Sequence, residues 1–250
     1  MSGKRAKAER RAASEPSEAS LNADAALRTA DAVLAVDLSD IPLTRVTQFI
    51  VGWCRAAFAQ SRVIGHLTLN GMSSAAAPNR RLFSELAIRL QWLRDLPREV
   101  RPNAVDEILE MARESKRGTH KHLGDMGWDV GFDSTEMDAF VLSSAEGTVK
   151  DQARKFASAA HATEVKNGPV FAMWREDSYL SHATGPLAGD YAPAIEDEVL
   201  GSDVPSELDA DLTGHRDISM LVIMATGALL TDEGVKSDAV ERLRSAFFSA

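Results

Sequence analysis

The feature that most constrains the fold of this chain is the return of apolar residues at intervals of three and four positions. The pattern runs through LNADAALRTADAVLAV (residues 21–36) and continues through LTRVTQFIVGWCRAAFAQSRVIGHLTL (residues 43–69). This spacing gathers the apolar side chains on one face of an α-helix. Runs that alternate β-branched and polar residues, which would indicate strands, are nearly absent. The sequence therefore predicts an all-α fold.

Helical spacing recurs up to the C-terminus, and the breaks between helices are mostly short. Pro97 ends one helix because a proline cannot continue it, and Pro102 suits the first turn of the next. Later helices are expected at residues 148–165, 170–184, 215–230 and 235–250. Short connections imply that neighbouring helices run antiparallel. We therefore predict one domain over residues 21–250, built as a bundle of roughly seven helices.

Residues 1–20, MSGKRAKAERRAASEPSEAS, differ from the rest of the chain because they contain hardly any bulky apolar side chains. Such a segment cannot bury enough surface to offset the entropy lost on ordering. We predict a disordered N-terminal tail that ends at residue 20. Its basic residues suit either contacts with RNA and acidic partners or a merely solubilising role.

Charge and hydropathy exclude several classes of protein. The formal net charge of −9 argues against broad non-specific binding to nucleic acids, but it allows a local basic site. No apolar run approaches the roughly 20 residues of a membrane span, and the N-terminus lacks the apolar stretch of a signal peptide. We therefore expect a cytoplasmic protein with no membrane partner.

Motifs for the commonest cofactor and metal chemistry are missing as well. The phosphate-binding patterns GxGxxG and GxxxxGK followed by Ser or Thr do not occur, and neither do HExxH and GxSxG. Cys54 is the single cysteine, and its apolar neighbours indicate a buried structural thiol. The six histidines are scattered along the chain. We therefore expect no cofactor and no metal site.

The segment RRLFSELAIRLQWL (residues 80–93) predicts a helix with two faces. Apolar residues form one stripe, and the opposite side holds Arg81, Glu85, Arg89 and Trp92. Glu85 stands four residues before Arg89, which is the favourable orientation for an intrahelical ion pair worth about 0.3 kcal/mol. Taken alone, this side of the helix has the composition of a surface.

The next helix, over residues 101–127, carries a basic stripe. The basic side chains that share one side of it at helical spacing are Arg113, Lys116, Arg117, His120 and Lys121. Basic residues near the end of a helix complement the helix dipole, and this accounts for much of the stripe. Contact with RNA phosphates is the sharper alternative for the same residues.

The stretch REDSYLSHATG (residues 175–185) places Arg175 and His182 seven positions apart. Seven residues are about two turns of an α-helix, so both side chains would project from nearly the same face and could address one phosphate. The alternative is structural: Arg175 pairs with Asp177 or Glu85, and His182 hydrogen-bonds a neighbouring loop at the end of the helix.

Two of these segments together resemble a family of bacterial helical proteins of unknown function. RRLFSELAIRLQWL resembles that family's helix of arginine, glutamate and aromatic residues, and SYLSHAT is similar to its later segment with tyrosine, Leu-Ser and histidine. The family looks like a relative of the HEPN domains, which are all-α modules of toxin–antitoxin and abortive-infection systems. Many HEPN domains are metal-independent ribonucleases with an arginine and a histidine separated by four to six residues.

The resemblance implies roles for particular residues. Arg175 and His182 would be catalytic, with His182 as general acid or base and Arg175 stabilising the charge of the transition state. Tyr179 and Ser181 would position the phosphate, with Glu85 and Arg89 as a supporting polar cluster. RNA, a homodimer and a protein partner such as an antitoxin are implied in the same way. We expect Glu85, Arg89 and residues 175–182 to meet in space.

A second hypothesis is a non-catalytic helical module that binds a protein partner in phage defence or stress response. Residues 188–214 carry eight carboxylates and no lysine or arginine, which is typical of an exposed acidic loop. Together with the basic stripe, this loop would offer two charged surfaces to a partner. The sequence alone leaves the ribonuclease and the interaction module as alternatives.

Overall fold

The computed structural model describes residues 17–128, 131, 141–163, 168–192, 194–195, 199–201 and 212–250. Within these residues the chain forms ten α-helices. They are α2 (Glu18–Leu34), α3 (Arg45–Leu69), α4 (Ala77–Asp95), α5 (Arg101–Asp125), α7 (Gly147–Arg154), α8 (Phe156–Ala162), α9 (Pro169–Leu180), α10 (Gly185–Tyr191), α11 (His215–Asp232) and α12 (Ser237–Phe248). The all-α prediction is confirmed, but the expected number of helices, roughly seven, is too low.

The remaining regular elements are short. The 3-10 helix η1 (Ser73–Ala76) leads into α4, and η2 (Arg98–Val100) leads into α5. Two strands of two residues each, β1 (Ala194–Ile195) and β2 (Val199–Leu200), pair antiparallel. These small elements join or extend the helices and build no separate layer.

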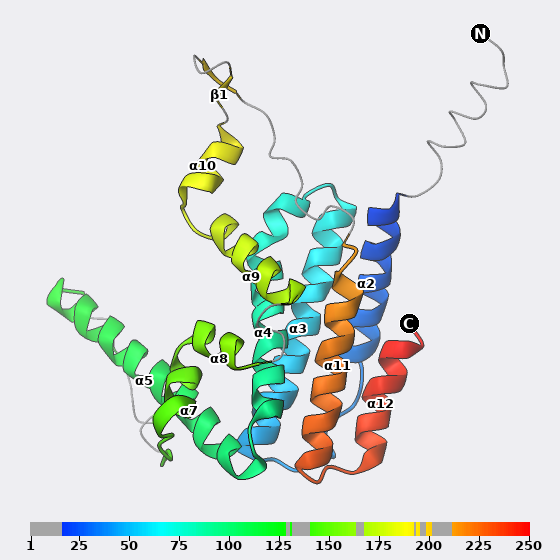
Figure 1. Ribbon diagram of the computed structural model, residues 1–250, viewed down its shortest axis with the longest axis vertical. Helices are drawn as coiled ribbons and strands as arrows, with labels where there is room; N and C mark the ends of the chain where they lie inside the picture. The colour runs from blue at the N-terminus through cyan, green and yellow to red at the C-terminus, as the bar shows by residue number, and fades with distance from the viewer. Residues whose placement is uncertain are drawn as a thin grey trace.

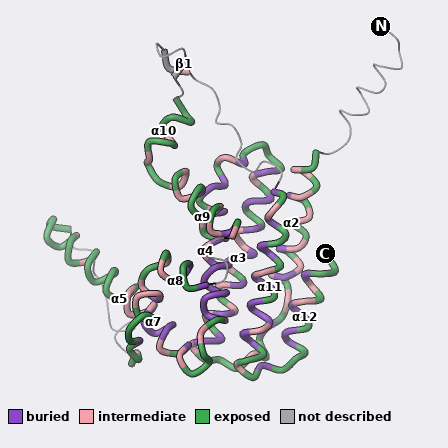
Figure 2. Tube along the Cα trace, viewed as in Figure 1, coloured by how far each residue is buried: buried purple, intermediate pink, exposed green. Residues whose placement is uncertain are grey.

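Five long helices form the main bundle. Helices α2, α3, α4, α11 and α12 run side by side along the long axis of the molecule, with α4 in contact with both α3 and α11 (Figure 1). Helix α9 packs on α4, while α7 and α8 bridge from α5 to α4. The distal half of α5 projects away from the bundle, and its side chains are mostly exposed (Figure 2).

The core follows the apolar stripes that the sequence predicts. Ile50, Phe58, Phe83 and Leu90 are among its fully buried side chains. Helices α2 and α3 approach each other closely at Gly65, where an added Cβ would lie 2.9 Å from the backbone oxygen of Ala23. A larger residue at this position would separate the two helices.

A single guanidinium ties the lower end of the bundle together. Arg101, at the start of α5, is buried and donates hydrogen bonds to the backbone oxygens of Leu93, Arg94 and Leu96 at the end of α4. It also forms ion pairs with Asp232 and Glu233 at the end of α11. These contacts satisfy carbonyl groups that have no partner within α4. The root of α5 is therefore fixed to two core helices.

Three helix boundaries differ from the sequence-based expectation. Helix α2 begins at Glu18 with Ser17 as its N-cap, so the last residues of the expected tail are helical, while residues 1–16 lie outside the described part of the chain. The expected helix at 148–165 is broken at Lys155, whose backbone is extended. Helix α10 (Gly185–Tyr191) extends into the expected acidic loop at 188–214, and much of the rest of that loop lies outside the described residues.

The two residues that flank the break between α7 and α8 contact different elements. Arg154, at the end of α7, is held by Glu107 and Glu114 of α5. Phe156, at the start of α8, packs on Trp174 of α9 with ring centroids 4.4 Å apart. The break at Lys155 therefore lies between a contact with α5 and a contact with α9.

Candidate functional site

Helix α9 positions the residues that the sequence singles out at 175–182, and it begins where the sequence predicts. Gly168 is the N-cap, and Pro169 occupies the first turn, where its missing N–H costs no hydrogen bond. Val170 and Asp177 are its buried residues, so this side of the helix faces α4.

The contacts between α4 and α9 include side chains of both helices that the sequence places near the site. The indole nitrogen of Trp174 lies 3.4 Å from a carboxylate oxygen of Glu85, and Nε of Arg81 donates to the hydroxyl of Ser178 over 3.0 Å. Glu85 therefore meets the 175–182 region through the residue that precedes it. The side chain of Arg175 takes no part in these contacts.

A buried ion pair anchors α9 most firmly. Arg80 is 3% exposed and Asp177 is 4% exposed, and Nε of Arg80 donates to the carboxylate over 3.0 Å. Nη1 of Arg80 also donates to the backbone oxygen of Ser73 over 2.6 Å. A buried charge requires such partners, because desolvation of an unpaired ion is costly. The sequence suggested Asp177 only as a partner of Arg175.

Arg89 and Trp92 are buried, although the sequence suggested an exposed face. Nη1 of Arg89 donates to the backbone oxygen of Gln152, and the guanidinium lies 5.4 Å from the ring centroid of Trp92 and 5.6 Å from that of Phe156. The Trp92 indole donates to the side chain of Gln152. Burial lowers the pKa of Arg89 below its ordinary value, while the charge of Glu85 opposes this shift. Helices α7 and α8 cover a surface that α4 alone would expose.

The opposite side of α9 faces solvent. Arg175, Glu176 and Tyr179 are exposed, and their spacing of three and four residues defines one helical face. Nη2 of Arg175 lies 3.2 Å from the hydroxyl of Tyr179, which holds the guanidinium along the helix. In the described part of the chain no ion pair links Arg175 to Asp177 or Glu85. The structural pairing proposed for Arg175 is therefore replaced by a contact with Tyr179.

His182 lies beyond the end of α9, so it does not share a helical face with Arg175. The helix ends at Leu180, and Ser181 is its C-cap. The Ser181 hydroxyl donates to the backbone oxygen of Asp177 over 2.5 Å, and Thr184 donates from its hydroxyl to the backbone oxygen of Tyr179 over 2.5 Å. These bonds end the helix because they occupy its last carbonyl groups. The imidazole of His182 is exposed on this turn.

The predicted RNA-contacting residues belong to the projecting half of α5. Lys116 and Arg117 are exposed, while Arg113 and His120 are partly buried. Nη1 of Arg113 lies 3.2 Å from a carboxylate oxygen of Glu110, one turn earlier in the helix. The basic stripe is thus carried by a different element from Arg175 and His182.

His215 is a buried polar residue that the sequence reading missed. His215 is the first residue of α11, and the prediction of this helix depends only on the apolar residues that follow it. Its Nε2 lies 2.8 Å from the hydroxyl of Ser61 on α3, and its ring stacks on Phe83 with centroids 4.5 Å apart. Burial lowers its pKa to about 4, and the charge of Arg80 adds to the effect. The imidazole is therefore neutral at neutral pH.

Metal and thiol chemistry find little support in the described part of the chain. No three His, Cys, Asp or Glu side chains gather there into a metal site. Cys54 is buried, as expected, and burial raises its pKa to about 11, so the thiol stays protonated. None of the helices described is long and apolar enough to cross a membrane.

Comparisons with known proteins found no match to this chain. No protein-family model matches the chain, and no curated protein matches it. No solved structure matches it either. The resemblance to HEPN-related proteins therefore stays a prediction, and the functional argument depends on the residues themselves.

Proposed function

We propose that this chain is a HEPN-like helical protein that binds RNA phosphate at the exposed end of α9 and cleaves RNA without a metal ion. One observation carries the proposal: the inner side of α9 is clamped to α4, while its outer side presents Arg175 and Tyr179, with His182 on the next turn. We place the protein in a defence or toxin–antitoxin system of the cytoplasm, on the resemblance alone.

The clamp on the inner side supports the proposal because catalytic side chains must be held in place. The Arg80–Asp177 pair and the contact of Trp174 with Glu85 fix one face of α9 to α4 at two positions one turn apart. Rigid secondary structure positions a reactive side chain better than a free loop does. Glu85 therefore acts through the packing of α9, while Arg89 holds α7 and α8 against α4.

The outer side offers the chemistry that a phosphate requires. A guanidinium has five N–H donors, and Arg175 uses one nitrogen for Tyr179, so donors remain for phosphate oxygens. Ser181 uses its hydroxyl on the backbone of α9, so its role is to shape the turn beneath His182. Tyr179 keeps Arg175 extended toward the end of the helix.

The proposed reaction is an intramolecular transfer. The 2′-oxygen of RNA attacks the adjacent phosphorus, its proton passes to His182, and the bond from phosphorus to the 5′-oxygen breaks. The leaving 5′-oxygen takes a proton from water, His182 returns its proton to the solvent, and the other product is a 2′,3′-cyclic phosphate. Arg175 stabilises the extra negative charge that the phosphate carries in the transition state. In the HEPN-like arrangement that we propose, two copies of the chain bring two such sites together, and an antitoxin covers them.

The test is cleavage of single-stranded RNA by the purified protein in the presence of excess chelator. His182→Ala should lower the rate by about 10² to 10⁴-fold, because this is the typical contribution of general acid–base catalysis. Arg175→Gln should have a comparable effect through lost charge stabilisation. His120→Ala is the matched control, since His120 follows Arg113 at the same spacing on α5, and its rate should stay unchanged.

A second substrate sharpens the test. RNA with a single 2′-deoxy nucleotide at the cleaved position should resist cleavage there, since it lacks the attacking oxygen. Cleavage that stops when chelator is added, or that survives His182→Ala undiminished, would exclude the proposed mechanism.

The interaction module is the second candidate, and the exposed end of α5 favours it. Met126 is 53% exposed and Trp128 is 65% exposed just beyond the end of α5, and the exposed basic residues Lys116 and Arg117 lie earlier on the same helix. Exposed aromatic and basic side chains together are typical of surfaces that bind proteins. Growth of bacteria that express the chain separates the two candidates. Toxicity that survives His182→Ala but disappears with Trp128→Ser would favour the interaction module.

A further inference from the structure

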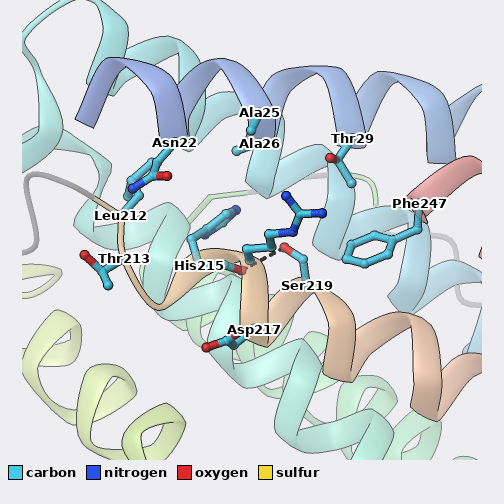
Figure 3. A pocket seen from close by; sticks show the side chains of 11 residues that line it. Asn22, Ala25, Ala26, Thr29, Leu212, Thr213, His215, Asp217, Ser219 and Phe247 are labelled. Carbon is cyan, nitrogen blue, oxygen red and sulfur yellow. Dashed lines mark hydrogen bonds between the residues drawn. The ribbon is translucent and has the colours of Figure 1, made fainter. Parts of the chain in front are cut away.

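A cavity of about 190 Å³ lies between α2 and α11, away from the exposed face of α9, and the end of α12 closes one side (Figure 3). Its apolar wall includes Ala25 of α2, Leu212 and Phe247. The lining also includes polar side chains, among them Asn22, Thr29 and Ser219. By size alone, a cavity of about 150 Å³ already holds a benzene ring. The available space therefore fits a molecule built around one ring.

His215 gives this cavity a buried polar group with unused capacity. Its side chain is 4% exposed, lines the cavity and reaches from α11 toward α2 (Figure 3). Nε2 is used by Ser61, but Nδ1 has no hydrogen-bond partner in the part of the chain that the structure describes. If Ser61 donates to Nε2, the neutral ring carries its proton on Nδ1 and can donate it to a ligand.

The positive charge at the cavity comes from Arg216, since His215 is neutral. Arg216 lines the cavity and is exposed, and within the described residues its guanidinium has no hydrogen bond or ion pair. The N-cap of α11 is Gly214, which provides no side-chain cap for the first turn. Uncapped N–H groups and the helix dipole both favour an anion at this position. Asp217, in the first turn of α11, also lines the cavity, and its carboxylate projects on the side of the helix turned away from α2 (Figure 3).

We propose that this cavity binds a small organic anion, namely a carboxylate attached to one flat apolar ring. The ring lies against Ala25, Leu212 and Phe247, and the carboxylate contacts Arg216 and Nδ1–H of His215. The site is separate from Arg175 and His182, so it does not depend on the proposed ribonuclease function. The competing occupant is water, which would fill a polar cavity without any preference for anions.

Benzoate is the probe for this site, and benzamide is its neutral counterpart of nearly equal shape. Titration of the full chain, followed by amide and imidazole NMR signals, should show saturable benzoate binding at millimolar concentration. Benzamide should bind at least about tenfold more weakly, because it lacks the charge-assisted hydrogen bonds. Binding should also fix the tautomer of His215 with the proton on Nδ1, which its ¹⁵N shifts report.

Three variants complete the experiment. Arg216→Gln removes an exposed charge and should weaken benzoate binding about tenfold, whereas Arg62→Gln on the exposed side of α3 should leave it unchanged. Ala25→Leu should abolish binding because the added side chain fills the cavity. Equal binding of benzoate and benzamide, equal binding by Arg216→Gln, or no saturation at millimolar concentration would overturn the proposal and leave water as the occupant.

Discussion

Helix α4 and the distal half of α5 carry similar charged residues but have opposite surroundings. Arg80 and Arg89 of α4 are buried, whereas Lys116 and Arg117 of α5 are exposed (Figure 2). Part of the difference lies in the helices themselves, because α4 carries a stripe of large apolar side chains, whereas residues 113–125 of α5 contain only one, Leu123. The rest comes from partners on other elements: Asp177 and the backbone of Gln152 reach the arginines of α4. A charged helix face becomes core where another element supplies an acceptor for each charge.

The largest test of this comparison is removal of the buried acceptor on α9. Asp177→Ala leaves the Arg80 guanidinium buried without its carboxylate, so we expect the free energy of unfolding to fall by about 3 to 5 kcal/mol. Urea denaturation measures this change. Glu176→Ala, one residue earlier and exposed, should change stability by less than about 0.5 kcal/mol. Equal effects of the two variants would show that the buried pair behaves like a surface pair.

The next effect concerns the buried imidazole that neighbours Arg80. The pKa of His215 is about 4 in the folded protein, whereas a histidine in the unfolded chain has a pKa of 6.5. Between these two values the unfolded chain binds a proton at His215 that the folded chain does not. This contribution to stability is complete above pH 6.5 and is lost as the pH falls toward 4, by about 3 kcal/mol in total. Denaturation midpoints between pH 7 and pH 4.5 measure the loss.

His215→Gln provides the control for the pH dependence. This variant should show a much flatter stability profile over that pH range, whatever its absolute stability. His120→Gln on α5 should keep the full slope of the original protein. A wild-type profile that is flat between pH 7 and pH 4.5 would mean that His215 titrates near its ordinary pKa.

Two glycines of α3 extend the comparison to the two sides of one helix. Gly65→Ala places a methyl group 2.9 Å from the backbone oxygen of Ala23, so it should cost about 1 to 3 kcal/mol through overpacking. An added Cβ at Gly52 meets no atom within 4 Å, so Gly52→Ala should stabilise the helix by up to about 1 kcal/mol. Thermal unfolding should show opposite signs for the two variants. The same sign for both would contradict the close approach of α2 and α3.

The smallest effect is expected on the projecting half of α5. Lys121 is exposed, so Lys121→Gln should change the free energy of unfolding by less than about 0.5 kcal/mol. Urea denaturation with the same analysis as for Asp177→Ala gives a direct comparison. A larger loss would mean that this half of α5 contributes to the fold more than its exposure indicates.

The sequence predicts where the helices lie better than it predicts which of their faces are buried by other helices. Apolar periodicity places most of the long helices correctly, and Pro97 and Pro169 mark boundaries because proline has fixed steric consequences. Periodicity cannot tell that Arg89 and Trp92 are covered, since the covering residues come from α7 and α8, about 60 positions away.

The candidate site shows the same limit. The sequence predicts contact between α4 and the 175–182 region, but the contacts come from Arg80 and Arg81. Glu85 reaches Trp174 instead, and Arg89 packs under α7 and α8. The sequence also places His182 on the helix, which ends two residues earlier, at Leu180. The bonds of Ser181 and Thr184 to the backbone decide the boundary, and such local competition is invisible to an apolar pattern. His215 was missed for another reason: its partner Ser61 lies 154 positions earlier in the chain.

The anchoring of α5 by Arg101 has a mechanical consequence. A helix of 25 residues is about 37 Å long, and here one end is held by the ends of α4 and α11 while the other end is exposed. Such a helix behaves as a lever. Because Arg154 of α7 also holds Glu114, the free arm of this lever begins near the middle of α5. A load applied to the exposed end therefore acts first on α7, and its torque grows with the length of the free arm.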